Sequence, residues 1–143
     1  MKKEILKAKR KDNGEWVYWN IFGELCRKSG KRTRVVNKKG STTSYYDYIH
    51  QIYQLIDMDT ICRYTGFTDK NGNMIWENDI IGYWDTYSTE NGLAEADCIG
   101  KVFWDDETLS FQVTERLSAE SYEVMDECSV IGNIFDNPEL ISN

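Results

Sequence analysis

The segment YTGFTDKNGNMIWENDII, from Tyr64 to Ile81, decides the fold class because it contains two predicted turns between short extended runs. In residues 69–72 (DKNG), the Asn-Gly pair stands where a tight turn favours residues that tolerate positive φ. Residues 77–79 (END) form a second predicted turn, and Gly66 permits a sharp exit from the first strand. The segment lacks the length and the terminal bidentate Glu of a calcium loop. We therefore interpret its Asp and Asn residues as structural turn formers.

Short extended runs with turn punctuation continue to the end of the chain. The predicted strands are TICRYT (60–65), NMIW (73–76), DIIGYWDTYS (79–88), DCIGKVFW (97–104), LSFQVT (109–114) and CSVIGNIF (128–135). Residues 89–96 (TENGLAEA) are predicted as a loop, and Pro138 closes the last strand. Strands of this length and spacing are typical of a small antiparallel barrel or sandwich.

The first part of the chain combines a predicted hairpin with one predicted helix. KDNG at 11–14 separates strand-like runs at 4–10 and 15–22, and RTRVV (32–36) could form a further strand. One helical face is formed by Tyr45, Tyr48, Ile49, Ile52, Tyr53 and Ile56, which follow a 3.6-residue period. This is the one helix that we expect. We place the division of the chain after it, giving residues 1–57 and 58–143.

Composition indicates an ordinary soluble protein of one domain or two small ones. The 143 residues are 41% hydrophobic and 29% charged, with five Trp, nine Tyr and five Phe. Neither a membrane-spanning run nor a secretory h-region is evident, so we expect a cytoplasmic protein. The scattered cysteines 26, 62, 98 and 128 then predict reduced, mostly buried thiols. With His50 the only histidine, a Cys/His zinc site has little support.

The predicted turns and the C-terminal segment VIGNIFDNPELI (130–141) carry a family resemblance. Together they resemble the two signature segments of the YopX family of phage and prophage proteins, "TGL-D-NG-I-EGDI" and "IGNIYENPEL". Phe67 stands at the Leu place, and Asn78 stands at the Gly place. Asn also tolerates the left-handed conformation, so the second change is compatible with the turn. The N-terminal segment is similar to the family's opening, whereas residues 23–58 match nothing in it.

The resemblance implies a mainly β protein. Its N-terminal part, residues 1–57, would be a β-rich, intertwined oligomerisation part with one helix. Residues 58–143 would form a small SH3-like β-barrel. The family further implies a homo-oligomeric ring, pentameric or hexameric, with no established enzymatic activity, so no catalytic residue, cofactor or metal ligand is carried over. The residues agree, because no nucleophile elbow, P-loop or dinucleotide fingerprint occurs.

Charge is divided unevenly along the chain and leaves two binding hypotheses open. Residues 1–46 hold 13 Lys and Arg against 4 Asp and Glu, whereas residues 47–143 hold 4 against 20. The basic half could meet the acidic half within one chain or between copies, in a protein that binds or scaffolds an unknown client protein. Alternatively, it could bind single-stranded nucleic acid. The candidate contact residues for either partner are Trp16, Tyr18, Trp19, Arg27, Lys28, Lys31, Arg32, Arg34, Lys38 and Lys39.

Overall fold

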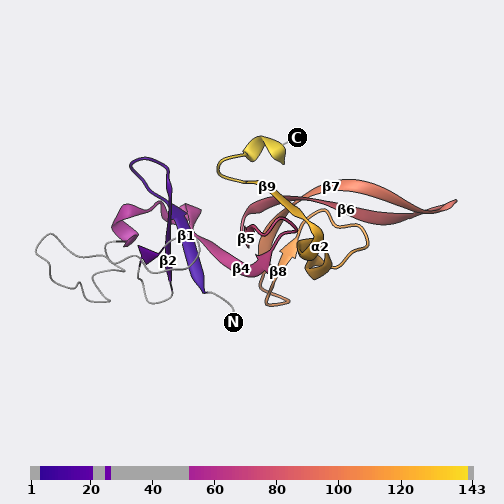
Figure 1. Ribbon diagram of the computed structural model, residues 1–143, viewed down its shortest axis with the longest axis horizontal. Helices are drawn as coiled ribbons and strands as arrows, with labels where there is room; N and C mark the ends of the chain where they lie inside the picture. Colours follow the sequence, from indigo (N-terminus) through magenta and orange to yellow (C-terminus); the bar gives the residue numbers. More distant parts are fainter. Residues whose placement is uncertain (1–3, 21–24, 27–51, 142–143) are drawn as a thin grey trace, which may run out of the picture. The chain divides into compact units, whose positions relative to one another are not determined.

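The chain forms two compact units, residues 1–64 and 65–143 (Figure 1). The computed structural model describes residues 4–20, 25–26 and 52–141. The boundary between the units falls inside strand β4 (Cys62–Thr68), further along the chain than the expected division after residue 57. One sheet has the strand order β3-β2-β1-β4-β5, and the other has the order β8-β7-β6-β9. The chain is therefore mainly β, as the sequence predicts.

Unit 1 is built on the hairpin predicted around KDNG. Strands β1 (Ile5–Lys9) and β2 (Trp16–Asn20) are antiparallel. The short strand β3 (Leu25–Cys26) pairs with β2, and the start of β4 pairs with β1. Gly14 has φ 72°, so the connecting turn uses the positive φ that its sequence predicts.

The core of unit 1 lies on one face of this hairpin. Ala8 and Trp19 are buried there with Ile52 and Ile56. Residues 52–55 are helical, which agrees with the end of the predicted helix. Tyr53 is 47% exposed, so its assignment to the apolar face is wrong. It follows Ile52 by one residue, which turns its side chain about 100° away around the helix axis. The earlier helix positions, His50 and RTRVV lie outside the described residues.

Within unit 1, a short turn connects the helical residues 52–55 to strand β4. Asp57 accepts a hydrogen bond from the backbone N–H of Asp59 at 3.1 Å and caps the 3-10 helix η1 (Met58–Thr60). The helical residues 52–55 have therefore ended before this turn begins.

Unit 2 contains most of the predicted strands. They are β5 (Met74–Trp76), β6 (Asp79–Thr89), β7 (Gly92–Asp105), β8 (Ser110–Val113) and β9 (Ser129–Asn133), and a 3-10 helix η2 (Pro138–Leu140) follows them. Helix α2 (Ser121–Glu127) contacts β6 and β8. The core includes Ile75, Ile81, Tyr83, Val102, Val113, Val124, Met125 and Cys128, so strands and helix bury one shared apolar cluster.

Residues 89–96 are not a loop, which corrects the prediction for TENGLAEA. Strands β6 and β7 pair continuously from Ile80↔Lys101 to Thr89↔Gly92. Gly92 has φ 110°, and the Thr89 hydroxyl donates to the Gly92 carbonyl at 2.7 Å, so a tight turn closes the hairpin. The two strands extend beyond the rest of unit 2 as an arm (Figure 1).

Helix α2 corrects the expectation of a single helix. Ser121, Val124, Met125 and Cys128 are buried at i, i+3, i+4 and i+7, which is one helical face. Glu120 and Glu123 form a reciprocal capping box at its start. The signal was present in the sequence, but four acidic residues from 120 to 127 make the stretch resemble a solvated loop.

The turn at residues 69–72 is organised by the buried carboxylate of Asp69. This carboxylate accepts hydrogen bonds from the backbone N–H groups of Asn71 at 2.9 Å and Asn73 at 2.8 Å. It also accepts one from Val130 in β9 at 2.9 Å. Burial alone would raise the pKa of Asp69, but these donors hold it below its ordinary value. The structural interpretation of the turn residues is confirmed.

The second predicted turn is also confirmed. Asn78 has φ 73°, so Asn does adopt the left-handed conformation at the place where the YopX signature has Gly. Asp79 accepts a hydrogen bond from the backbone N–H of Trp76 at 2.8 Å. The turn therefore directs the chain from β5 into β6.

The cysteines are structural side chains. Cys26, Cys62 and Cys128 are buried, Cys98 is half-buried, and none of the four takes part in a disulfide bond. Burial raises the pKa of Cys128 to about 12, so this thiol stays protonated and packs as an apolar group.

Replacement of Gly72 by Val should destabilise the protein by about 1–2 kcal/mol. Gly72 has φ 83° and a Cβ there would meet no atom within 4 Å, so the cost is backbone strain rather than a clash. Gly72→Asn is the matched control, because Asn tolerates this conformation. Urea unfolding of the three proteins measures the difference. Equal stabilities for Gly72→Val and the wild type would contradict the turn geometry.

Candidate partner-binding surfaces

The structure separates the three aromatic residues of the predicted contact set. Trp19 is only 7% exposed and belongs to the core of unit 1. Trp16 and Tyr18 are half-buried on the opposite face of the hairpin. Successive strand residues point to opposite faces, so Trp19 cannot share a surface with the other two. The seven predicted cations, Arg27 to Lys39, lie outside the described residues.

Trp16 is covered by lysine side chains. The Lys7 amine lies 4.2 Å from the centre of the Trp16 ring, and the Lys9 amine lies 5.6 Å from it. The strand register places Lys9 opposite Trp16 and Lys7 opposite Tyr18. Cations at these distances are attracted to the ring face. The lysines therefore occupy the surface on which a nucleic-acid base would have to stack.

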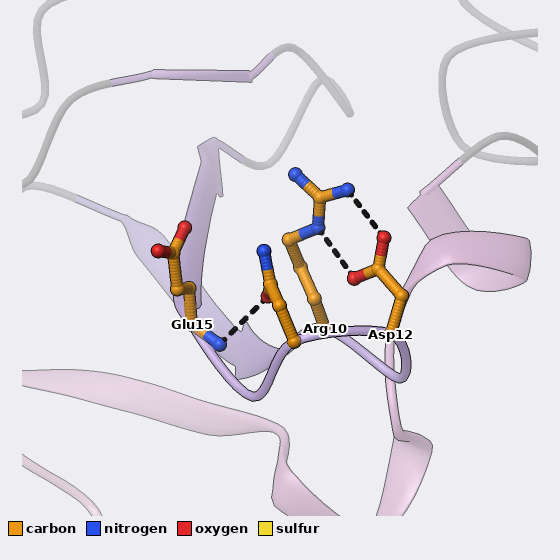
Figure 2. A network of polar contacts seen from close by, with 4 residues as sticks. Arg10, Asp12 and Glu15 are labelled. Carbon is orange, nitrogen blue, oxygen red and sulfur yellow. Dashed lines mark hydrogen bonds and ion pairs between the residues drawn. The ribbon is translucent and has the colours of Figure 1, made fainter.

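The tip of this hairpin is held by a local ion pair (Figure 2). The Arg10 guanidinium donates two hydrogen bonds to the Asp12 carboxylate, at 2.9 and 2.7 Å. Hydrogen bonding to Asp12 raises the pKa of Arg10, and the same contact lowers the pKa of Asp12. The Asn13 side chain accepts from the backbone N–H of Glu15 at 2.9 Å. The charge of Arg10 is thus already paired within the turn.

Unit 2 contains a groove of about 320 Å³ that was not predicted from the sequence. Its aromatic lining comes from Phe67 in β4, Tyr83 and Trp84 in β6, and Tyr122 in α2. Trp84 is 68% exposed and Tyr122 is 62% exposed, which is unusual for rings of this size. The groove therefore presents apolar surface to solvent.

Three carboxylates border the same groove. Glu123, Asp126 and Glu127 lie on the exposed side of α2, and none of the lining residues is Lys or Arg. The surrounding unit reinforces this charge, because residues 65–143 hold 3 Lys and Arg against 17 Asp and Glu, a net −14. An aromatic surface with a carboxylate rim is suited to a cationic side chain.

Asp85 positions the loop that forms one wall of the groove. Its buried carboxylate accepts hydrogen bonds from the backbone N–H groups of Leu117 at 2.7 Å, Ser118 at 3.2 Å and Ala119 at 3.0 Å. Burial would raise the pKa of Asp85, but these bonds and one from Thr86 lower it to about 2. Ala119 lines the groove, so Asp85 supports the site without touching its interior.

Comparison with known proteins agrees with the resemblance seen in the sequence. A model of the family described as YopX protein matches residues 7–142. The chain belongs to the YopX family. A crystal structure of protein EF1440 from Enterococcus faecalis is similar, with a TM-score of 0.52 and 22% identity, over 99% of this chain and 100% of that chain. This likeness supports the fold. No curated protein matches the chain.

A second hollow in this YopX-family chain has a different character. It measures about 490 Å³ and is lined by Ile99, Lys101, Thr114, Glu115, Leu140 and Ile141. Its lining contains one cation, Lys101, and one carboxylate, Glu115, so it favours neither a cationic nor an anionic ligand.

The described part of the chain offers neither a metal-binding cluster nor a membrane-spanning helix. No cluster of three or more His, Cys, Asp or Glu side chains suitable for a metal ion occurs there. Within the same residues, no helix is both long enough and apolar enough to span a bilayer.

The acidic turn at residues 105–107 is stabilised by its own contacts. The Asp105 carboxylate accepts a hydrogen bond from the backbone N–H of Glu107 at 3.0 Å.

Acidification should destabilise this protein through Asp85. The folded-state pKa of about 2 lies below the ordinary value of 3.8, so the stabilisation is fully present above about pH 4. It is lost as the pH falls from about 4 towards 2. Asp85→Asn should remove this part of the pH dependence and cost about 2–3 kcal/mol at neutral pH.

Thermal unfolding between pH 2 and pH 7 measures both effects. Asp97→Asn, which changes an exposed carboxylate on β7, is the control and should cost less than about 0.5 kcal/mol. An Asp85→Asn protein with wild-type stability at neutral pH would contradict the anchoring role.

Proposed function

We propose that this protein is a non-enzymatic assembly module of a phage or prophage. It works in the cytoplasm of the bacterial host as a homo-oligomeric ring, a pentamer or hexamer, that binds or scaffolds an unknown client protein. In this proposal unit 2 is the small SH3-like barrel that the family resemblance implies. Unit 1 carries the intertwined oligomerisation part.

The observation that supports this proposal is the separation of charge between the two units. Residues 1–64 hold 14 Lys and Arg against 7 Asp and Glu, a net +7, whereas residues 65–143 carry −14. A chain with one basic and one acidic unit is complementary to further copies of itself. A head-to-tail contact of this kind closes into a ring when the rotation between copies permits.

The alternative function is single-stranded nucleic-acid binding through the basic N-terminal segment. It is favoured by the Lys7, Lys9 and Trp16 cluster, which places cations and an aromatic ring on one face. Against it, Trp19 is buried and Trp16 is already covered by lysine. The acidic unit 2 would also repel phosphate.

Replacement of Arg27, Lys28, Arg32 and Arg34 by Ser separates the two functions. If the basic segment contacts an acidic neighbour, the oligomer should dissociate in the variant, and added salt should loosen the wild-type oligomer likewise. If the segment binds phosphate, the oligomer should persist while DNA affinity and its salt slope fall. Light scattering after size exclusion, at 50 mM and 500 mM salt, measures the first outcome.

The second outcome is measured by titrating a fluorescent single-stranded oligonucleotide. A wild-type protein that is monomeric at both salt concentrations would contradict the assembly function. Tight oligonucleotide binding at physiological salt, with an oligomer unaffected by the four replacements, would establish the alternative.

A further inference from the structure

Resting on the proposed assembly function, we propose that the α2–β6 groove of one copy receives the basic segment of a second copy. The groove is the hollow lined by Phe67, Tyr83, Trp84 and Tyr122, with Glu123, Asp126 and Glu127 at its rim. The basic segment is residues 27–39, which contain seven Lys and Arg and no Asp or Glu. The proposal identifies which acidic surface of unit 2 makes the contact.

The first argument is charge complementarity at the groove itself. Asp126 and Glu127 are exposed at the last turn of α2, and Glu123 precedes them by one turn. None of the three cations of residues 65–143, Lys70, Lys101 and Arg116, lines the groove. Arg116 instead donates to the backbone carbonyls of Val113 and Ala119, at 3.2 and 2.8 Å. The rim thus lacks a neutralising cation among its own lining residues.

The second argument is the aromatic surface between these carboxylates. Trp84 and Tyr122 belong to different elements, β6 and α2, yet both line the groove and both are more than 60% exposed. Guanidinium and ammonium groups bind over such rings and gain further from adjacent carboxylates. Phosphate would meet only negative charge at this place. The chemistry therefore favours an Arg- and Lys-rich peptide.

The third argument is stoichiometry. Each chain contributes this groove from its described residues and one basic segment from its sequence, so a single head-to-tail contact between two copies leaves one groove and one segment unfilled. Every groove is filled only when the series of copies closes. The groove and segment thereby supply the heterologous contact that the proposed ring requires.

Charge reversal at the groove tests this inference in the full-length chain. The groove variant carries Asp126→Lys and Glu127→Lys, and it leaves Glu123 unchanged because Glu123 accepts the capping hydrogen bond from Glu120. The matched control carries Glu90→Lys and Glu95→Lys, two exposed carboxylates on the β6–β7 arm. Both variants change the net charge by the same amount. Circular dichroism melting checks that both remain folded.

Sedimentation at a series of concentrations then measures assembly. The groove variant should dissociate at concentrations about 10- to 100-fold higher than the wild type, whereas the control should assemble as the wild type does. Adding Arg32→Glu and Arg34→Glu to the groove variant should restore assembly, because the reversed charges again attract. A merely destabilised groove variant would not be rescued in this way.

The outcomes distinguish this inference from the proposed function. If the wild type is oligomeric and the groove variant assembles equally well, the groove is not the contact, and the assembly function stands. If the groove variant and the control variant weaken assembly equally, assembly depends on the overall charge of unit 2, and the groove is not a specific contact site. If the wild type is monomeric at every concentration, the assembly function itself fails, and the inference fails with it.

Discussion

The Asp69 carboxylate holds together the two sequence segments on which unit 2 depends. It accepts hydrogen bonds from the backbone N–H groups of Asn71 and Asn73 in its own turn. It accepts a further one from Val130, which is 61 residues away in sequence. A buried carboxylate is costly unless hydrogen bonds satisfy it. The Asp69 carboxylate therefore couples the turn at residues 69–72 to strand β9, so that each stabilises the other.

Unit 2 repeats this use of buried carboxylates at Asp79 and Asp85. Asp79 accepts a hydrogen bond from the backbone N–H of Trp76. Asp85 accepts hydrogen bonds from the backbone N–H groups of Leu117, Ser118 and Ala119. Backbone donors satisfy these groups by hydrogen bonding but carry no net charge. Backbone hydrogen bonds thus stabilise the loops around these carboxylates, and residues 65–143 as a sequence carry 17 Asp and Glu against 3 Lys and Arg.

Local patterns in the sequence predicted the turns and most strands, because Asn-Gly pairs and alternating apolar runs act over a few residues. The remaining features depend on strand pairing and on which face of a strand each side chain occupies, and local patterns do not predict these. Trp16 and Trp19 look equivalent in sequence, but a spacing of three places them on opposite faces of β2. Continuous pairing of β6 with β7 turned the apparent loop at 89–96 into strand. The groove combines β4, β6, the loop at Ala119 and α2, so no contiguous motif could have indicated it.

The positions of the exposed aromatic rings separate the two classes of partner. In unit 1, Trp19 is buried and Trp16 lies beneath two lysine amines. In unit 2, Trp84 and Tyr122 are the exposed rings of the groove, and carboxylates surround them. A nucleic-acid strand needs exposed rings within positive potential, so that bases stack while phosphates are neutralised. The excess of Lys and Arg lies in the sequence of residues 1–64, whereas the exposed rings of the groove lie in the acidic unit 2. A cationic peptide needs rings and negative charge at one place, as the groove provides.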